Sequence, residues 1–219
     1  MKPFAVILCG SGFRDGSEIR ESVALLWALS TFNVAHRCFA LDAPQHDVIN
    51  SLTGETMAER RNQLIESARI ARAAVSPLER LDPDHFSGLL FPGGFGAAKN
   101  LSDFAFKGAQ GTVVPRVKTA VEAFFCARKP IGAICIAPAI VGLALAGKGL
   151  ELSVGKLCDA SRAIEAMGHR HIETLVSQCH IDSKNRIVTT PAYMYDDANL
   201  SELFEGIRKL VGAVMELSH

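Results

Sequence analysis

The chain alternates along its whole length between short apolar runs and amphipathic segments, and this alternation restricts the folds open to it. Segment 4–9 is a continuous apolar run that ends in glycines, as in a strand buried on both faces of a sheet. Segment 18–31 follows, with Ile19, Val23 and Leu26 on a helical period. A strand followed by a helix, repeated many times, predicts a mostly parallel sheet with helices on both faces.

The remaining segments continue this pattern. Strands are expected at 34–40, 88–91, 130–134, 152–155 and 186–190, and helices at 56–73, 115–128, 136–146, 160–167 and 200–217, with a hairpin near 182–185. The longest irregular stretch expected is 95–111, which suits a lid or a dimer contact. No repeat or low-complexity linker interrupts the series. The sequence therefore predicts one α/β domain over residues 1–219, a three-layer α/β/α sandwich with a mostly parallel central sheet.

Charge and hydropathy exclude several classes of protein. The 219 residues carry 23 basic and 23 acidic side chains, without a basic block, so nucleic acid and anionic membrane surfaces are poor candidates for a partner. No apolar run is long enough to span a bilayer, because Gly132, Pro138 and Gly142 interrupt the longest one. The apolar start at 4–8 has no signal-peptide cleavage site after it. A cytoplasmic location is expected.

The six cysteines do not form a recognisable framework. None belongs to a C-x-x-C pair, and their spacing matches neither a zinc site nor a disulfide scaffold. The thiol chemistry expected of this chain needs no metal or organic cofactor. Several of them lie in apolar runs, where cysteine acts as a small hydrophobic residue. Five of the six are therefore expected to be inert, and they are Cys9, Cys38, Cys126, Cys158 and Cys179.

Cys135 differs from the others because it stands where an apolar strand passes directly into a helix. The small residues Gly132, Ala133 and Ala137 surround it in sequence, as a sharp strand-to-helix turn requires. A thiol at a helix N-terminus faces unpaired N–H groups and the positive end of the helix dipole, so a lowered pKa is expected. Cys135 is therefore the predicted nucleophile.

Two glycine-rich segments follow other predicted strands. Pro92-Gly93-Gly94 closes the strand at 88–91, and the N–H groups of Gly94 and Ile136 would form an oxyanion hole if they are aimed at Cys135. The alternative for this segment is an ordinary glycine turn. The segment 9–18 has its last glycine one place too late for a dinucleotide-binding loop, so nucleotide binding is not expected.

Glu18 begins the helix after the first strand, at the sheet edge where ligands of open α/β sheets bind. A carboxyl group there can face Cys135 and transfer a proton, particularly if burial raises its pKa. The alternative is a glutamate that only complements the helix dipole. Asp15 or Ser17 is expected to cap this helix.

Together these features resemble the ThiJ/PfpI superfamily, whose fold is the flavodoxin-like, class I glutamine amidotransferase-like sandwich. The chain is most similar to its ElbB-like family of enhancing-lycopene-biosynthesis (ES1-like) proteins. The segments that carry this resemblance cover nearly the whole chain, and they are 15–18, 47–50, 52–55, 92–101, 135–139 and 189–194.

The resemblance implies a homodimer with a reactive Cys135, a neighbouring Glu18 and an oxyanion site from Gly94 and Ile136. It also implies a weak glutathione-independent glyoxalase, a hydro-lyase that takes a small dicarbonyl substrate, glyoxal. The link to isoprenoid biosynthesis comes from the family name alone and states no reaction.

The chain departs from the superfamily at the position after the nucleophile, where Ile136 replaces the histidine of many members. The late region that would hold a glutaminase histidine reads Thr190-Pro191-Ala192-Tyr193, and His169, His171 and His180 are expected at the surface or in loops. Glutamine hydrolysis is therefore not expected. Two alternatives to the glyoxalase stay open: a redox sensor with an oxidisable Cys135, and an amidotransferase-like partner subunit.

Overall fold

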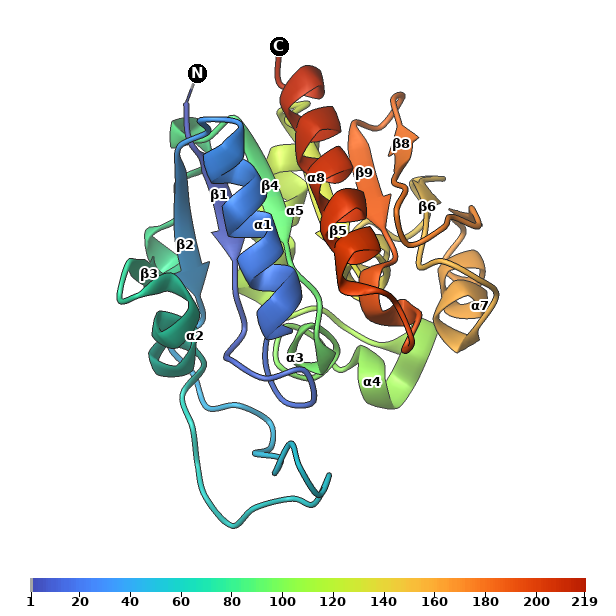
Figure 1. The fold of residues 1–219 in the computed structure, drawn as a ribbon. Helices are drawn as coiled ribbons and strands as arrows, with labels where there is room; N and C mark the ends of the chain where they lie inside the picture. The colour runs from blue at the N-terminus through green and yellow to red at the C-terminus, as the bar shows by residue number, and fades with distance from the viewer. Residues whose placement is uncertain (1) are drawn as a thin grey trace.

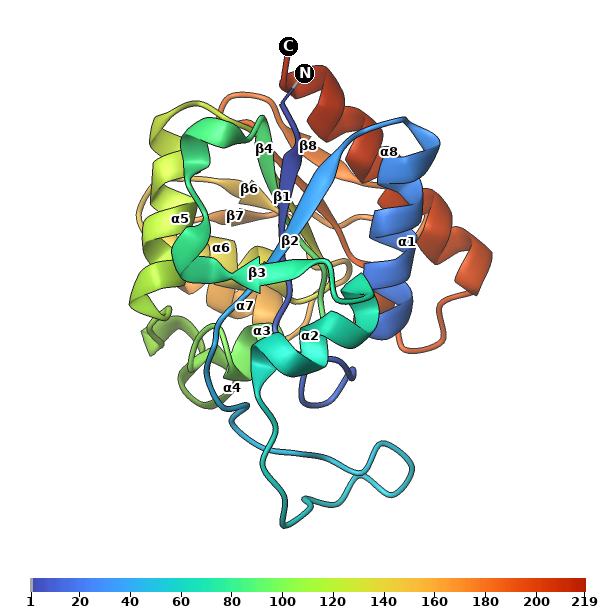
Figure 2. The ribbon, with the colours of Figure 1, turned by 90° about the vertical axis from the view of Figure 1, so that its left-hand side faces the viewer.

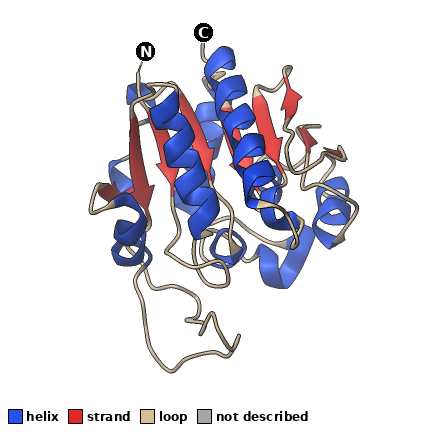
Figure 3. Ribbon diagram, in the orientation of Figure 1, coloured by secondary structure: helices blue, strands red, loops and turns tan. Residues whose placement is uncertain are grey.

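The computed structural model describes residues 2–219, which form a seven-stranded sheet between two layers of helices (Figures 1 and 3). The strand order is β3-β2-β1-β4-β5-β9-β8, and only β8 runs antiparallel to its neighbour. The strands are β1 (Phe4–Ile7), β2 (His36–Ala40), β3 (Val75–Pro77), β4 (Gly88–Phe91), β5 (Ile131–Ile134), β8 (His180–Asp182) and β9 (Ile187–Thr190). The predicted α/β/α sandwich is confirmed.

Helices cover both faces of this sheet (Figure 2). On one face lie α1 (Ile19–Thr31), α2 (Gln63–Ala71) and α8 (Leu200–Leu217). On the other lie α3 (Phe95–Lys99), α5 (Pro115–Cys126), α6 (Ala137–Ala144) and α7 (Asp159–Ala166), with α4 (Phe104–Lys107) beside α3. Every residue of β1, β4, β5 and β9 is buried, which explains why β1, β4 and β5 have continuous apolar sequences.

The structure corrects the sequence prediction in two loop regions. Segment 95–111 is not the longest irregular stretch, because it contains α3, α4 and a 3₁₀ turn. The helix expected at 56–73 begins only at Gln63, since the Asn62 side chain accepts from the N–H groups of Leu64 and Ile65. The longest stretch without helix or strand is instead 41–62, which projects from the sheet edge (Figure 1).

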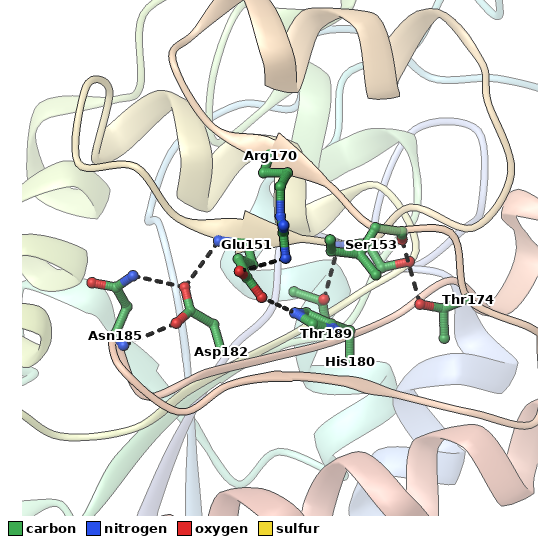
Figure 4. A network of polar contacts seen from close by, with 9 residues as sticks. Glu151, Ser153, Arg170, Thr174, His180, Asp182, Asn185 and Thr189 are labelled. Carbon is green, nitrogen blue, oxygen red and sulfur yellow. Dashed lines mark hydrogen bonds and ion pairs between the residues drawn. The ribbon is translucent and has the colours of Figure 1, made fainter.

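A second, two-stranded sheet of β6 (Glu151–Leu152) and β7 (Arg170–His171) is joined to the main sheet by polar contacts (Figure 4). The Asp182 carboxylate, only 4% exposed, accepts from the Glu151 N–H, the Asn185 N–H and the Asn185 side chain. Beside it, Thr189 on β9 accepts from the N–H of Ser153 at 2.9 Å. These contacts hold the second sheet against β8 and β9 of the main sheet, and β9 ends beside Cys135.

Replacing Asp182 by Ala is expected to lower the free energy of unfolding by about 2–3 kcal/mol, because three donors lose a buried carboxylate acceptor. Urea unfolding followed by circular dichroism measures the change. The exposed Asp196 serves as the control, and Asp196→Ala should change stability by no more than about 0.5 kcal/mol. Equal stability of the two variants would contradict a structural role for Asp182.

Candidate active site

Cys135 lies at the turn between β5 and α6, in the position that the sequence predicts. Its φ of 62° falls in the left-handed region, which residues other than glycine rarely adopt. A strained turn of this kind presents the side chain of a nucleophile at the end of a strand. The N–H of Cys135 donates to the carbonyl oxygen of Thr190 at 2.9 Å, so β9 helps to hold the turn.

A buried carboxyl group lies against this thiol, and it belongs to Glu21. The Glu21 side chain is hydrogen bonded to Cys135 and is completely buried. Its two oxygens are held by main-chain donors, Oε2 by the N–H of Gly93 at 3.0 Å and Oε1 by the N–H of Tyr193 at 3.1 Å. The carboxyl group is therefore fixed in orientation as well as in position.

Glu18 has a different place from the one expected. It is the N-cap of α1, and its Oε2 accepts from the N–H of Glu21 at 2.6 Å. The carboxyl group in hydrogen-bond contact with the thiol is that of Glu21, one helical turn further on, because the first turn of α1 directs residue 21 toward the elbow. Asp15 and Ser17 do not cap this helix, since they accept from the N–H groups of Ile49 and Cys9.

The structure brings the two expected N–H groups to the thiol. The N–H of Gly94 and the N–H of Ile136 both form hydrogen bonds to Cys135. They come from different parts of the chain, Gly94 from the loop after β4 and Ile136 from the start of α6. Two N–H groups that converge on one nucleophile can stabilise an oxyanion on the atom it attacks.

Gly93 allows these groups to approach one another. A Cβ on Gly93 would overlap both the Cβ of Cys135 and Oε2 of Glu21, and it would lie 3.0 Å from the Cys135 sulfur. Gly94 has a φ of 98°, and a Cβ there would overlap the main chain of Glu18. The Gly-Gly pair is thus required by close packing as well as by the turn.

The pKa of Cys135 differs from the expectation. Burial raises it well above its ordinary value, and the negative charge of Glu21 raises it further, against the N–H groups of Gly94 and Ile136. The expected fall in pKa is wrong because the thiol is only 8% exposed, and desolvation exceeds the effect of the helix N-terminus. Burial likewise raises the pKa of Glu21 to about 8, with the charge of Glu18 as the second cause.

This arrangement gives the pair a specific chemical capacity. When the pair has lost one proton, the remaining proton is shared between sulfur and carboxyl oxygen, since two negative charges in contact inside the protein are strongly disfavoured. The carboxylate can therefore take the thiol proton as the sulfur attacks. A thiol so activated needs no lowered pKa in the resting state.

The histidines are engaged elsewhere. His169 is buried, which corrects its expected surface position, and its ring bonds to the Leu150 N–H and the Gly142 carbonyl. His171 lies on β7. His180 lies on β8 and pairs with Glu151 at 2.9 Å (Figure 4). The partners of His169 and His180 are Leu150, Gly142 and Glu151, so none of these bonds reaches Cys135 or Glu21.

The glycine-rich segment after β1 folds upon itself. The N–H of Gly12 donates to Ser17 O at 2.9 Å and the N–H of Gly16 to Gly12 O at 2.7 Å, so neither is directed at a ligand. Within residues 2–219, no group of three or more His, Cys, Asp or Glu side chains is arranged to hold a metal ion. No helix of this part of the chain has both the length and the apolar character of a membrane span.

Sequence reasoning missed Glu21 and the N–H of Tyr193. Glu21 follows Glu18 by one helical turn, so a signal was present: only one of the two can point at the elbow when the other caps the helix. Tyr193 gave no such signal because its contribution is a main-chain N–H. It reaches Glu21 because Ala192 adopts a φ of 43°.

Comparison with known proteins identifies the family. No family model matches the chain. A rat protein named "ES1 protein homolog, mitochondrial" is 40% identical over 224 residues, which cover 98% of this chain and 83% of the relative. The human "Glutamine amidotransferase-like class 1 domain-containing protein 3, mitochondrial" is also 40% identical, over 98% of this chain and 82% of its own.

The chain belongs to the ES1-like (ElbB-like) family. This confirms the resemblance seen in its motifs. A crystal structure titled as an isoprenoid biosynthesis protein with an amidotransferase-like domain, from Ehrlichia chaffeensis, shares 37% identity with a TM-score of 0.93 and covers 99% of both chains. A DJ-1 superfamily protein from Salmonella typhimurium, at 18% identity, has a TM-score of 0.56 over all of this chain and 89% of its own, and shows the shared fold alone.

The names of the curated ES1 relatives correct one expectation. The rat, human and zebrafish proteins are all named as mitochondrial. The cytoplasmic location expected from the sequence is therefore contradicted, since the relatives point to mitochondria. Composition and charge were too weak a basis for a location.

Proposed function

We propose that this ES1-like protein is a glutathione-independent glyoxalase that converts glyoxal and water to glycolate. The observation that carries the proposal is the hydrogen bond between the Cys135 thiol and the buried Glu21 carboxyl group, with the N–H groups of Gly94 and Ile136 at the same sulfur. A nucleophile, a base and an oxyanion site are the three groups that addition to a carbonyl requires.

In the first step the Cys135 sulfur attacks one aldehyde carbon of glyoxal while Glu21 takes the thiol proton. The oxygen of that carbon becomes an alkoxide near the N–H groups of Gly94 and Ile136, and Glu21 returns the proton to it. The product is a hemithioacetal, in which sulfur is bonded to a carbon that carries hydrogen and hydroxyl.

In the second step Glu21 removes the hydrogen of that carbon as a proton. The electron pair forms a carbon–carbon double bond, and Glu21 passes the proton that it removed to the far aldehyde oxygen, which gives an enediol. Glu21 then takes the exchangeable proton of the near hydroxyl group and delivers a proton to the far carbon, so that the near carbon becomes a thioester carbonyl. One aldehyde is thereby oxidised and the other reduced within the same molecule, so no external oxidant is required.

In the last step water adds to the thioester carbon, and the bond from carbon to sulfur breaks. The sulfur leaves as a thiolate that takes up a proton, and glycolate is released. The addition of water creates a second oxyanion, and the N–H groups of Gly94 and Ile136 stabilise it as they stabilise the first. The sum is one glyoxal plus one water to one glycolic acid.

Glycolate formation in D₂O tests the proposal. Passage through an enediol should place solvent deuterium on the CH₂ carbon of glycolate, whereas the base-catalysed reaction in solution transfers hydride within glyoxal and places none there. Mass spectrometry of glycolate made with and without protein distinguishes the two routes. Glycolate at the background rate, or glycolate without deuterium, would contradict the proposed reaction.

The two other candidate functions receive less support. Peroxide reacts with the thiolate, and the raised pKa of Cys135 keeps the thiol protonated, which argues against a redox sensor. Glutamine hydrolysis depends on a base that also protonates the leaving amine, and the histidine bonds described above lie elsewhere. A homodimer stays a prediction, which sedimentation velocity can check.

A further inference from the structure

Glu18 contacts the loop after β4 as well as its own helix. Its N–H donates to the carbonyl oxygen of Gly93 at 2.9 Å, and its Oε2 accepts from the N–H of Glu21 at 2.6 Å. Its own carbonyl oxygen accepts from the hydroxyl of Ser22 at 2.6 Å and from the Ser22 N–H at 3.0 Å. Main chain and side chain of Glu18 therefore both fix the first turn of α1.

These contacts hold Gly93 at both ends. Its N–H donates to Oε2 of Glu21, and its carbonyl accepts from the N–H of Glu18. In a planar trans peptide, the carbonyl of Gly93 and the N–H of Gly94 point in opposite directions. Because the carbonyl is directed at Glu18, the Gly94 N–H is directed away from it, and there it meets the Cys135 sulfur.

The charge of Glu18 acts on the same pair. The titratable side chains that act on Glu21 are Cys135 from the elbow and Glu18 from the start of α1. Arg20 acts on Glu18, and the Tyr193 ring from the turn after β9 lies against Arg20. The charge of Glu18 raises the pKa of Glu21. Arg20 favours the charged form of Glu18 and itself donates to the Tyr193 hydroxyl at 2.9 Å.

We propose that Glu18 is a positioning residue for this site: it orients the Gly93–Gly94 peptide and Glu21 toward Cys135, and its negative charge retains a proton on the Glu21–Cys135 pair. The expected effect of Glu18 on turnover rests on the proposed function, whereas its expected effect on the reactivity of the Cys135 thiol rests on the contacts alone. Glu18 itself exchanges no proton with the substrate, which separates its role from that of Glu21.

The test compares Glu18→Gln with Glu18→Ala. Glutamine keeps an oxygen that can accept from the Glu21 N–H but removes the charge, whereas alanine removes both. Iodoacetamide alkylation of Cys135, followed by mass spectrometry from pH 6 to 10, reports the pH midpoint of thiol reactivity without glyoxal. Turnover of glyoxal is measured in parallel, and Glu122→Gln on the exposed face of α5 is the control.

In Glu18→Gln the alkylation midpoint is expected to fall by about one pH unit, since a neighbouring negative charge is removed. In Glu18→Ala the midpoint should fall similarly, and kcat should fall by about tenfold more than in Glu18→Gln at similar KM. The reason is that the first turn of α1, which carries Glu21 and the main-chain N–H bonded to Gly93, loses its side-chain cap. Glutamine thus restores much of the turnover lost in the alanine variant.

A midpoint in Glu18→Gln that equals those of the wild type and Glu122→Gln would overturn the electrostatic role. Equal kcat in the alanine and glutamine variants would overturn the orienting role. Failure of the proposed function is recognisable separately, because a wild-type protein that makes no glycolate still gives alkylation midpoints that decide the first question.

Discussion

The Cys135→Ala variant is expected to produce glycolate only at the background rate, a loss of at least about 1,000-fold relative to the wild type. The reason is that every intermediate of the proposed route is bonded to the Cys135 sulfur. The measurement is deuterated glycolate formed from glyoxal in D₂O, so that glycolate from the solution reaction does not count. Alanine keeps the Cβ that packs beside Gly93, and the fold should be retained.

The matched control is Cys126→Ala. Cys126 is exposed and ends α5, on the helical layer opposite α1. Its replacement should leave turnover within about twofold of the wild type, because it touches no group of the site. Equal rates in the Cys135→Ala variant and the wild type would remove the nucleophile from the mechanism, whatever reaction is being catalysed.

Glu21→Gln is expected to lower kcat for glyoxal by about 100- to 10,000-fold, the usual contribution of a positioned acid or base. The amide keeps the size of the carboxyl group and one acceptor oxygen, but it cannot take the thiol proton. In the wild type kcat should rise as the pH increases through about 8, the pKa to which burial raises Glu21, because the base acts in its ionised form. This step should be absent in Glu21→Gln.

Stability supplies an independent check on Glu21. Its pKa is higher in the folded protein than its ordinary value of 4.5, so the folded state binds the proton more tightly. The contribution of this tighter proton binding to the free energy of unfolding is fully present below pH 4.5 and is lost as the pH rises through about 8. Glu21→Gln should remove that loss, and the exposed Glu216→Gln should not. A pH profile of unfolding that is the same in all three proteins would contradict a buried ionisable Glu21.

The order of elements and the elbow were predictable because each rests on a strong local pattern. Buried parallel strands are continuous apolar runs, and Cys135 follows one of them directly, with small residues on both sides. The strand expected at 152–155 is only the two-residue β6 at 151–152, and β7 was not predicted, since these strands are held by Asp182 and its neighbours and not by apolar periodicity. The same applies to segment 41–62, whose shape depends on distant side chains such as Asn100.

The site was predictable in kind but not in every residue. The strand ends indicate which loops meet at one edge of the sheet, and they correctly bring Gly94 and Ile136 to Cys135. The choice between Glu18 and Glu21 depends on which residue caps α1, a matter of one residue in the helix boundary. The pKa of Cys135 depends on how deeply the elbow is covered, which no local pattern states.

The carboxyl group and the main-chain donor that holds it are 172 residues apart in sequence, in Glu21 and Tyr193. A nascent chain that has emerged only as far as α6 contains both Cys135 and Glu21, but it lacks β9 and the turn that follows. The main-chain N–H of Cys135 then has no Thr190 carbonyl to bond, and the Glu21 carboxyl group lacks one of its two main-chain donors. The contacts around the Glu21–Cys135 pair can therefore be completed only after Thr190 and Tyr193 have been synthesised.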